Sequence, residues 1–310
     1  MSSVSKEFVG QVVRHALAQC FPDHHPVGRP SSTARVVFDS TDAMAIKQEI
    51  IDVGRKLWLR EYVDGNGGNI SYRITEDLVL CTPTMLSKAD LTLDDICLVN
   101  SENEMIIGKR SHTSEMLLHL EIYKAVPKAK AVIHCHPPHA TAYAITGSVP
   151  PAGIIPEQEV FVGLVATTHY ETPGTKAFAE TVLPYIKKHN TILLENHGVV
   201  CWADTVTHAE WCVEVLETYC RTLILASQLG KPIRYIPAEK IAGLLEIKRR
   251  LGLPDARLDE PEDTKIPDPL VQNSWNSSKI GKNKGFDDPL ELLVMRIVEE
   301  VLRFASSTNE

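Results

Sequence analysis

Two histidines in the segment AVIHCHPP have the type and spacing that metal chemistry requires. His134 and His136 are two residues apart in an apolar run, and side chains at i and i+2 of a strand point to the same face. Pro137 and Pro138 cannot continue a central ladder, so the strand should end there, where a ligand can enter. Surface or hydrogen-bonded core histidines also give this spacing, so the pair alone leaves both interpretations open.

A catalytic metal needs a third protein ligand and one position left for the substrate. His197 in LLENHGVV follows an apolar run and precedes Gly198, which predicts a place at a strand end beside a tight turn. Glu115 begins the helix predicted after RSHTS, and it could ligate a metal or act as a general base. A first-turn glutamate often serves only as a cap, and this alternative stays open.

Three further segments are typical of anion binding. The sequence GNGGNIS can present several backbone N–H groups in a concave loop. The sequences CTPT and HTS add hydroxyl groups, and HTS leads into a helix N-terminus, which favours anions. Each segment taken alone is an ordinary turn. Neither a Walker motif nor a G-x-G-x-x-G fingerprint occurs.

The elements that must position these residues alternate along the chain. Alternating apolar patterns predict strands in NISYRI, DLVLCTPT, ICLVN, EMIIG and KAVIHCHP, and a strand pair in TILLENHGVVCW. Helical spacing predicts helices in STDAMAIKQEIIDVGRKLWLREYV, TSEMLLHLEIYKAV, HATAYAIT, GTKAFAETVLPYIKK, TVTHAEWCVEVLETYCRTLILASQLG and residues 237–251. This alternation indicates an α/β fold in which helices cover a mixed sheet.

Composition limits the classes of function. The chain has 310 residues and a net charge of -8, which argues against a nucleic-acid-binding protein. It contains no run of 18 apolar residues and no signal-peptide pattern, so we expect a cytoplasmic protein without a membrane segment. The seven cysteines form no C-x-x-C pair and are odd in number, which indicates reduced thiols, several of them in the core.

The sequence divides into five parts. Residues 1–21 and 288–310 each predict an amphipathic helix, because apolar residues recur on one face. Residues 22–38 are rich in Pro, Ser and Gly and predict a linker, and residues 253–287 predict an extended arm. Residues 39–252 lie between them and predict the compact catalytic domain.

Five segments occur in an order that resembles the class II aldolase/adducin family: GNGGNISYR, TPTMLSKADL, TSEMLLHLEIYKAVPKAKAVIHCHPPHATA, PEQEVFVG and LLENHGVVCWADTVTHAEWCVEVLE. The resemblance covers residues 40–251. It implies a mainly antiparallel central sheet flanked by helices, and a homotetramer with active sites at subunit interfaces. It also implies one zinc ion per subunit, bound by His134, His136 and His197.

The same resemblance assigns roles to further residues. Glu115 matches the glutamate that ligates zinc in the resting enzyme and serves as proton donor and acceptor. The positions that hold the substrate phosphate and its neighbouring oxygens correspond here to Gly68, Asn69, Thr84, Met85, Thr113 and Ser114. The family usually has glycine where this chain has Met85, so a backbone N–H can serve there only if the local conformation tolerates a side chain.

The activity that the resemblance implies is that of a metal-dependent lyase. The expected reaction is cleavage of a ketose 1-phosphate, L-fuculose 1-phosphate first of all, to dihydroxyacetone phosphate and lactaldehyde. The alternatives are an L-ribulose-5-phosphate 4-epimerase-like or a methylthioribulose-1-phosphate dehydratase-like enzyme, and a non-catalytic adducin-like assembly module. The adducin branch lacks the metal histidines, so the presence of all three favours an enzyme.

The terminal helices suggest a second hypothesis. Short amphipathic helices on tethers resemble the encapsulation peptides that bring enzymes into bacterial microcompartments. Residues 288–305, or residues 4–21, would then bind a shell protein, and the enzyme would lie in the microcompartment lumen. Packing of these helices on the core or on a neighbouring subunit is the alternative.

Overall fold

The computed structural model describes residues 32–259. Its helices and strands follow in the order α2 (Ser32–Phe38), α3 (Thr41–Leu59), β1 (Asn69–Arg73), β2 (Leu78–Cys81), β3 (Cys97–Asn100), β4 (Met105–Ile107), α4 (Met116–Ala125), β5 (Ala131–Cys135), α5 (Pro138–Thr146), α6 (Pro156–Phe161), β6 (Ala166–Thr167), α7 (Lys176–Glu180), β7 (Thr191–Leu194), β8 (Gly198–Ala203), α8 (Val206–Ser227) and α9 (Ala238–Arg250). Short 3-10 helices occupy Leu93–Asp95 and Ala256–Asp259. The predictions for residues 1–21, 22–31, 260–287 and 288–310 fall outside the described residues.

One eight-stranded sheet organises the described part of the chain. Its strand order is β4-β3-β2-β1-β5-β8-β7-β6, and every neighbouring pair is antiparallel except β6 with β7. The mainly antiparallel α/β fold expected from the sequence is therefore confirmed for these residues. Strand β5, which carries His134 and ends just before His136, lies between β1 and β8 in the middle of the sheet.

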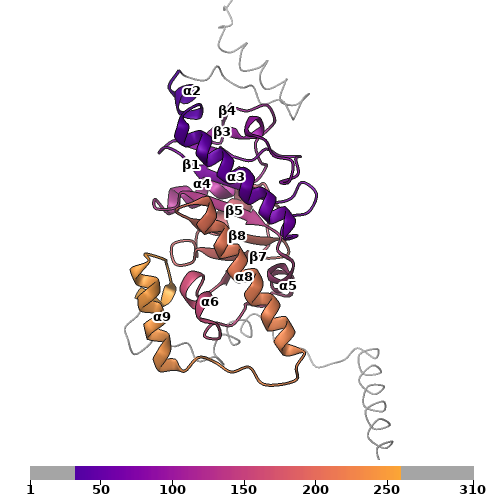
Figure 1. Cartoon of the computed structure of the whole chain (residues 1–310), viewed down its shortest axis with the longest axis vertical. Coiled ribbons are helices and arrows are strands. Elements are labelled where there is room, and N and C mark those ends of the chain that lie inside the picture. Colours follow the sequence, from indigo (N-terminus) through magenta and orange to yellow (C-terminus); the bar gives the residue numbers. More distant parts are fainter. Residues whose placement is uncertain (1–31, 260–310) are drawn as a thin grey trace, which may run out of the picture. The chain divides into compact units, whose positions relative to one another are not determined.

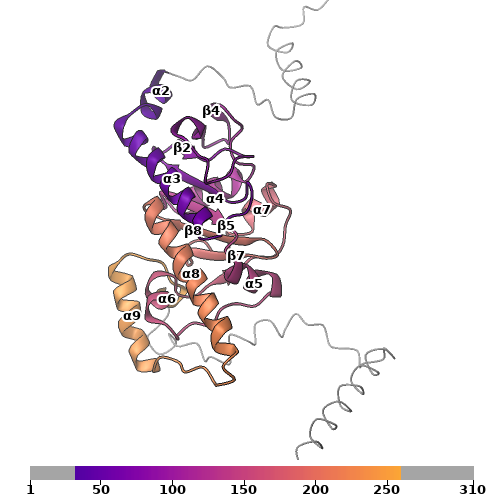
Figure 2. The same ribbon diagram turned by 45° about the vertical axis from the view of Figure 1, so that its right-hand side comes forward.

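Helices cover both faces of the sheet (Figures 1 and 2). Side chains on one face pack with α3, α5 and α8; these are Ile70, Leu80, Leu98, Ile133, Leu193 and Val199. Side chains on the other face pack with α4 and α7; these are Val79, Val99, Val132, Ile192, Leu194 and Val200. Because successive strand residues point to opposite faces, Cys135 joins the first cluster while His134 lies on the side of α4.

The linker prediction was wrong for residues 32–38, which form α2. Ala34 and Phe38 are buried in the core, and Lys47 of α3 donates to the carbonyl oxygen of Phe38 at 2.8 Å. Helix α3 begins as predicted, because the Ser40 side chain accepts from the N–H of Ala43. The compact domain therefore begins before residue 39.

The helix predicted for GTKAFAETVLPYIKK was also wrong in its length. Helix α7 ends at Glu180, and residues 181–188 form consecutive turns. Pro184 lies in this segment, lacks an N–H group and disfavours helical backbone at Leu183. Helix α6 and the two-residue strand β6 carry patterns too short for sequence periodicity to predict.

The predicted boundary at residue 252 does not hold for the residues just beyond it. Asp255 and Arg257 are buried and form a hydrogen-bonded ion pair at 2.8 Å. Arg257 also contacts Glu159 of α6 at 2.8 Å, and Asp255 lies 3.5 Å from Lys248 of α9. The polar composition that predicted an extended arm here comes partly from this buried ion network.

The structure bears on two expectations from composition, the lack of a membrane segment and the reduced cysteines. No helix among residues 32–259 is long and apolar enough to cross a membrane. The six cysteines in this range, Cys81, Cys97, Cys135, Cys201, Cys212 and Cys220, are free thiols and are all buried. Their placement confirms the expectation that several thiols pack in the core.

Candidate metal centre and active site

The end of β5 and the β7–β8 turn bring three imidazoles together. His134 is fully buried, and its Nδ1 lies 2.9 Å from the carbonyl oxygen of Val199 on β8. A carbonyl only accepts, so this contact places the proton on Nδ1 and leaves Nε2 free as a ligand. His136 follows the strand, and its Nδ1 lies 3.2 Å from Oδ1 of Asp64. His197 stands in the tight turn, next to Asn196 in left-handed conformation.

The donor set fits a divalent metal. One ring nitrogen from each of His134, His136 and His197 lies within 4.8 Å of the other two. Nε2 of His134 is 3.1 Å from Nε2 of His136, and Nδ1 of His197 is buried without a hydrogen-bond partner among the described residues. Burial lowers the pKa of His134 and of His197, which favours the neutral form that ligates metal. The cluster could hold a divalent metal ion.

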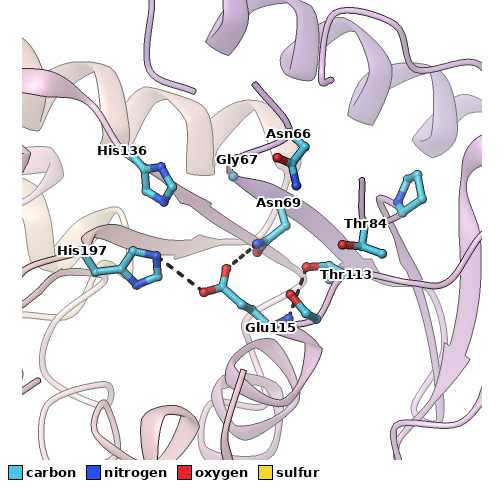
Figure 3. Close-up of a pocket in the computed structure, with 11 residues that line it drawn as sticks. Asn66, Gly67, Asn69, Thr84, Thr113, Glu115, His136 and His197 are labelled. Carbon is cyan, nitrogen blue, oxygen red and sulfur yellow. Dashed lines mark hydrogen bonds and ion pairs between the residues drawn. The ribbon is translucent and has the colours of Figure 1, made fainter. Parts of the chain in front are cut away.

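Glu115 lies beside this cluster and does not act as a helix cap. It occupies the N-cap position of α4, yet its side chain makes no capping hydrogen bond. Its Oε2 is 3.3 Å from Nε2 of His134, and its Oε1 is 3.6 Å from Nε2 of His197. Figure 3 shows the carboxylate pointing between His197 and Asn69. The structure thus excludes the capping interpretation of this side chain.

A buried hydrogen-bond chain supports Glu115 from behind. Asn69 Nδ2 donates to Glu115 Oε2 at 2.7 Å, and Asn69 Oδ1 lies 2.5 Å from Nε2 of His119. Nδ1 of His119 is 2.6 Å from Oγ of Ser71, which is 2.7 Å from the hydroxyl of Tyr123. Burial lowers the pKa of His119 to about 3, so this imidazole is neutral and carries a single N–H.

Every group in this series of hydrogen bonds finds a partner if the bonds are donated in one direction, from Tyr123 towards Glu115. The hydroxyl of Tyr123 donates to Ser71, Ser71 donates to Nδ1 of His119, and Nε2–H of His119 donates to Asn69 Oδ1. The amide of Asn69 then faces Glu115 with its N–H group, which favours the carboxylate as an acceptor. His119 was not among the site residues predicted from the sequence. Its spacing of four residues from Glu115 on one helical face was the available signal.

A pocket of about 180 Å³ opens beside the histidines and Glu115. It is lined by Asn66, Gly67, Gly68, Asn69, Pro83, Thr84, Thr113, Ser114, Glu115, His136 and His197 (Figure 3). Five of the six residues predicted to bind substrate are in this lining, and Met85 is not. Asn66, Gly67 and Pro83 lie in the segments GNGGNIS and CTPT, which were predicted to bind anions, but they were not among the individually predicted substrate residues. None of the lining side chains is a lysine or an arginine.

Comparison with known proteins agrees with this geometry. Residues 48–224 match the family model described as class II aldolase and adducin N-terminal domain. The chain belongs to the class II aldolase/adducin family. The family and the three-histidine cluster together indicate a metal-dependent enzyme, a lyase or a decarboxylase.

Relatives within the class II aldolase/adducin family include two kinds of enzyme. The L-fuculose phosphate aldolase of Methanococcus maripaludis is 37% identical over 169 residues, which cover 54% of this chain and 91% of that protein. The 3-oxo-tetronate 4-phosphate decarboxylase of Haemophilus influenzae is 28% identical over 205 residues, covering 65% and 96%. A solved L-fuculose 1-phosphate aldolase matches with a TM-score of 0.61 and 27% identity, covering 69% of this chain and 98% of that one.

Met85 departs from the usual sequence of the class II aldolase/adducin family but keeps a backbone conformation typical of glycine. Its φ is 55°, in the left-handed region that a side chain makes costly. The side chain is 74% exposed, and its sulfur lies 3.5 Å from Nδ2 of Asn66 at the edge of the pocket. The local conformation therefore tolerates a side chain, which is largely exposed to solvent beside Asn66.

Proposed function

We propose that this chain is a zinc-dependent aldolase that cleaves L-fuculose 1-phosphate to dihydroxyacetone phosphate and lactaldehyde. The observation that carries the proposal is the position of Glu115. This carboxylate lies between three imidazoles that can hold a metal and a pocket wall rich in hydroxyl and backbone N–H groups. A retro-aldol reaction on a sugar phosphate needs an electron sink, a proton-transfer group and a phosphate site within one small volume.

The metal site proposed here holds one zinc ion per subunit. His134, His136 and His197 would supply three nitrogen ligands, and Glu115 would complete the resting site. Three protein nitrogens with one further exchangeable position are typical of catalytic zinc. When bound, the ion supplies Lewis-acid stabilisation of the negative charge that develops on the substrate's carbonyl and hydroxyl oxygens.

The protein groups would carry out the remaining tasks. The phosphate would lie against the backbone at Gly68 and the hydroxyls of Thr84, Thr113 and Ser114, with the backbone N–H of Met85 as a further donor in this proposal. Asn69 would keep the carboxylate of Glu115 aimed into the pocket. Glu115, displaced by substrate from its resting position, would take up the proton that the C4 hydroxyl loses as the C3–C4 bond breaks, directly or through solvent. It would then deliver a proton to C3, the carbon next to the carbonyl.

Aldol cleavage is favoured over decarboxylation by the charge of the pocket. A 3-oxo acid phosphate carries a carboxylate in addition to its phosphate, whereas a ketose 1-phosphate carries the phosphate alone. The described lining has no lysine or arginine side chain that could pair with a second substrate carboxylate, and Glu115 adds a negative charge beside the proposed metal. The higher identity to the aldolase of Methanococcus maripaludis points the same way.

The test compares kcat/KM for two substrates with the zinc-loaded protein. We expect L-fuculose 1-phosphate to give dihydroxyacetone phosphate and lactaldehyde in equal amounts, at least about tenfold more efficiently than 3-oxo-tetronate 4-phosphate gives carbon dioxide. A preference for the 3-oxo acid would assign the decarboxylase function instead. Parallel reactions with ribulose 5-phosphate and methylthioribulose 1-phosphate test the epimerase and dehydratase alternatives, and inactivity on all four substrates would favour the adducin-like module.

Assembly and location remain part of the proposal. We propose a homotetramer on the basis of the family, and native mass spectrometry tests this. The shell-protein hypothesis concerns residues 4–21 and 288–305, which lie outside the described residues. Deleting residues 286–310 should leave the aldolase active in the cytoplasm and abolish co-purification with shell protein, and retained association would contradict the hypothesis.

A further inference from the structure

Lys88 is a buried cation that the proposed mechanism does not use. Its side chain is 1% exposed, and its Nζ donates to the carbonyl oxygens of Asn66 at 3.1 Å and Leu86 at 2.8 Å. No carboxylate among the described residues pairs with it. Burial lowers its pKa to about 8, and no charged side chain contributes to that shift. Burying an ammonium group without a counter-ion is costly, so its retention calls for a reason.

The position of Lys88 suggests that reason. Asn66 belongs to the glycine-rich loop on one side of the pocket, and Leu86 follows Thr84 and Met85 on the other side. One ammonium group therefore ties the two loops together immediately behind the pocket wall. The backbone of Lys88 also packs closely on α3, because a Cβ at Gly54 would lie 3.1 Å from the carbonyl oxygen of Lys88.

The pocket lining itself offers little positive charge for a bound phosphate. The described lining holds no cationic side chain and carries one carboxylate, Glu115. A phosphate dianion placed there needs a positive potential beyond that of neutral hydroxyl and backbone donors. A cation held in the low-dielectric interior one peptide group behind the wall supplies such a potential with little screening by solvent.

We propose that Lys88 is a positioning residue for the substrate's phosphate group: it fixes the two pocket loops relative to one another and supplies the buried positive charge that balances the dianion. This inference rests on the proposed function in one respect, because it requires the phosphate to bind in this pocket. It assigns Lys88 no contact with the reacting atoms.

Sulfate binding tests the proposal without requiring catalysis. Sulfate keeps a charge of two throughout the working pH range, so calorimetric titration reports only the protein's groups. We expect Lys88→Met and Lys88→Gln to bind sulfate about thirtyfold more weakly than the wild type. Lys47→Met is the matched control, because Lys47 is also buried (2% exposed) and donates to one carbonyl oxygen, that of Phe38. This control should bind sulfate within twofold of the wild type.

Kinetics separate positioning from general damage to the fold. Lys88→Met should raise KM for the phosphorylated substrate about thirtyfold and change kcat by less than about threefold, whereas a misfolded pocket would lower kcat as well. Unchanged sulfate affinity and unchanged KM in both Lys88 variants would overturn the inference, as would a wild type that binds no sulfate. If the wild type binds sulfate but cleaves none of the sugar phosphates, the proposed function fails while the sulfate comparison still decides the role of Lys88.

A measurement on the wild type covers the case in which neither Lys88 variant folds. Because the buried ammonium titrates near pH 8, its charge is largely lost between pH 7.5 and 9.5. Sulfate affinity should fall about tenfold across this range if that charge holds the anion. Affinity that stays constant within twofold would overturn the inference.

Discussion

Replacing His119 with leucine tests the hydrogen-bond chain that orients Glu115. The substitution fills the buried position with an apolar side chain and removes both ring nitrogens. Asn69 Oδ1 then loses its donor at 2.5 Å, and one hydroxyl proton of the Ser71–Tyr123 pair loses its acceptor at 2.6 Å. Each buried polar group left without a partner costs about 1–3 kcal/mol, so we expect the free energy of unfolding to fall by about 3 kcal/mol.

The same substitution should reduce activity because the Glu115 carboxylate is oriented less firmly, while the groups that touch the substrate are unchanged. Without His119, the orientation of the Asn69 amide is set by Glu115 alone and loses the donor that fixes Oδ1, so Nδ2 is held less firmly against the carboxylate. We expect kcat for the aldol cleavage to fall about thirtyfold. The proposed zinc ion should stay bound at one per subunit, because the three proposed histidine ligands are intact.

Urea denaturation, metal analysis and steady-state kinetics measure these effects. Tyr123→Phe is the matched control, because it removes only the last hydroxyl of the chain and leaves Ser71 free to donate to His119. It should cost about 1 kcal/mol and change kcat by less than about twofold. An His119→Leu protein with wild-type stability and kcat would refute the reasoning, and so would a loss of zinc equal to the loss of activity.

Three further predictions concern the same site. Glu115→Gln should keep zinc bound by the three imidazoles yet lower kcat about a thousandfold, as metal analysis and single-turnover rates would show. His197→Ala should leave less than about one-tenth of the zinc bound after dialysis, whereas zinc content equal to that of the wild type would remove His197 from the ligand set. The pKa of His119 is lowered on folding from its ordinary value of 6.5 to about 3, so its contribution to stability is complete above pH 6.5 and is lost as the pH falls. Between pH 7.5 and pH 5, wild-type protein should lose about 2 kcal/mol more than His119→Leu in urea denaturation, and equal losses would contradict the predicted burial of a neutral imidazole.

Local patterns were sufficient to predict much of the sheet and of the histidine cluster. The strand phase at His134 and His136 predicts their common face, and the glycine after His197 predicts a tight turn. The family resemblance added which of the chain's histidines meet. The chain's periodicity could not show that, because His197 reaches the site only through the pairing of β8 with β5.

The supporting groups of the site were beyond sequence reasoning for a physical reason. His119 lies in an apolar helix, where a histidine pointing into the core and one pointing to the surface give the same pattern. The role of Lys88 depends on two carbonyl oxygens, and a carbonyl leaves no signal in the sequence. Asp255 and Arg257 look like part of a polar arm because their charges are neutralised only by tertiary contacts.

Proton exchange on dihydroxyacetone phosphate tests the central claim most directly. The proposed site should remove and return a proton at the hydroxymethyl carbon without any aldehyde present, so the zinc-loaded protein in deuterium oxide should place deuterium at that carbon. NMR should detect this exchange in the wild type, and it should fall to the uncatalysed rate after zinc is removed or in Glu115→Gln. Exchange that continues unchanged without zinc or without the Glu115 carboxylate would contradict the account.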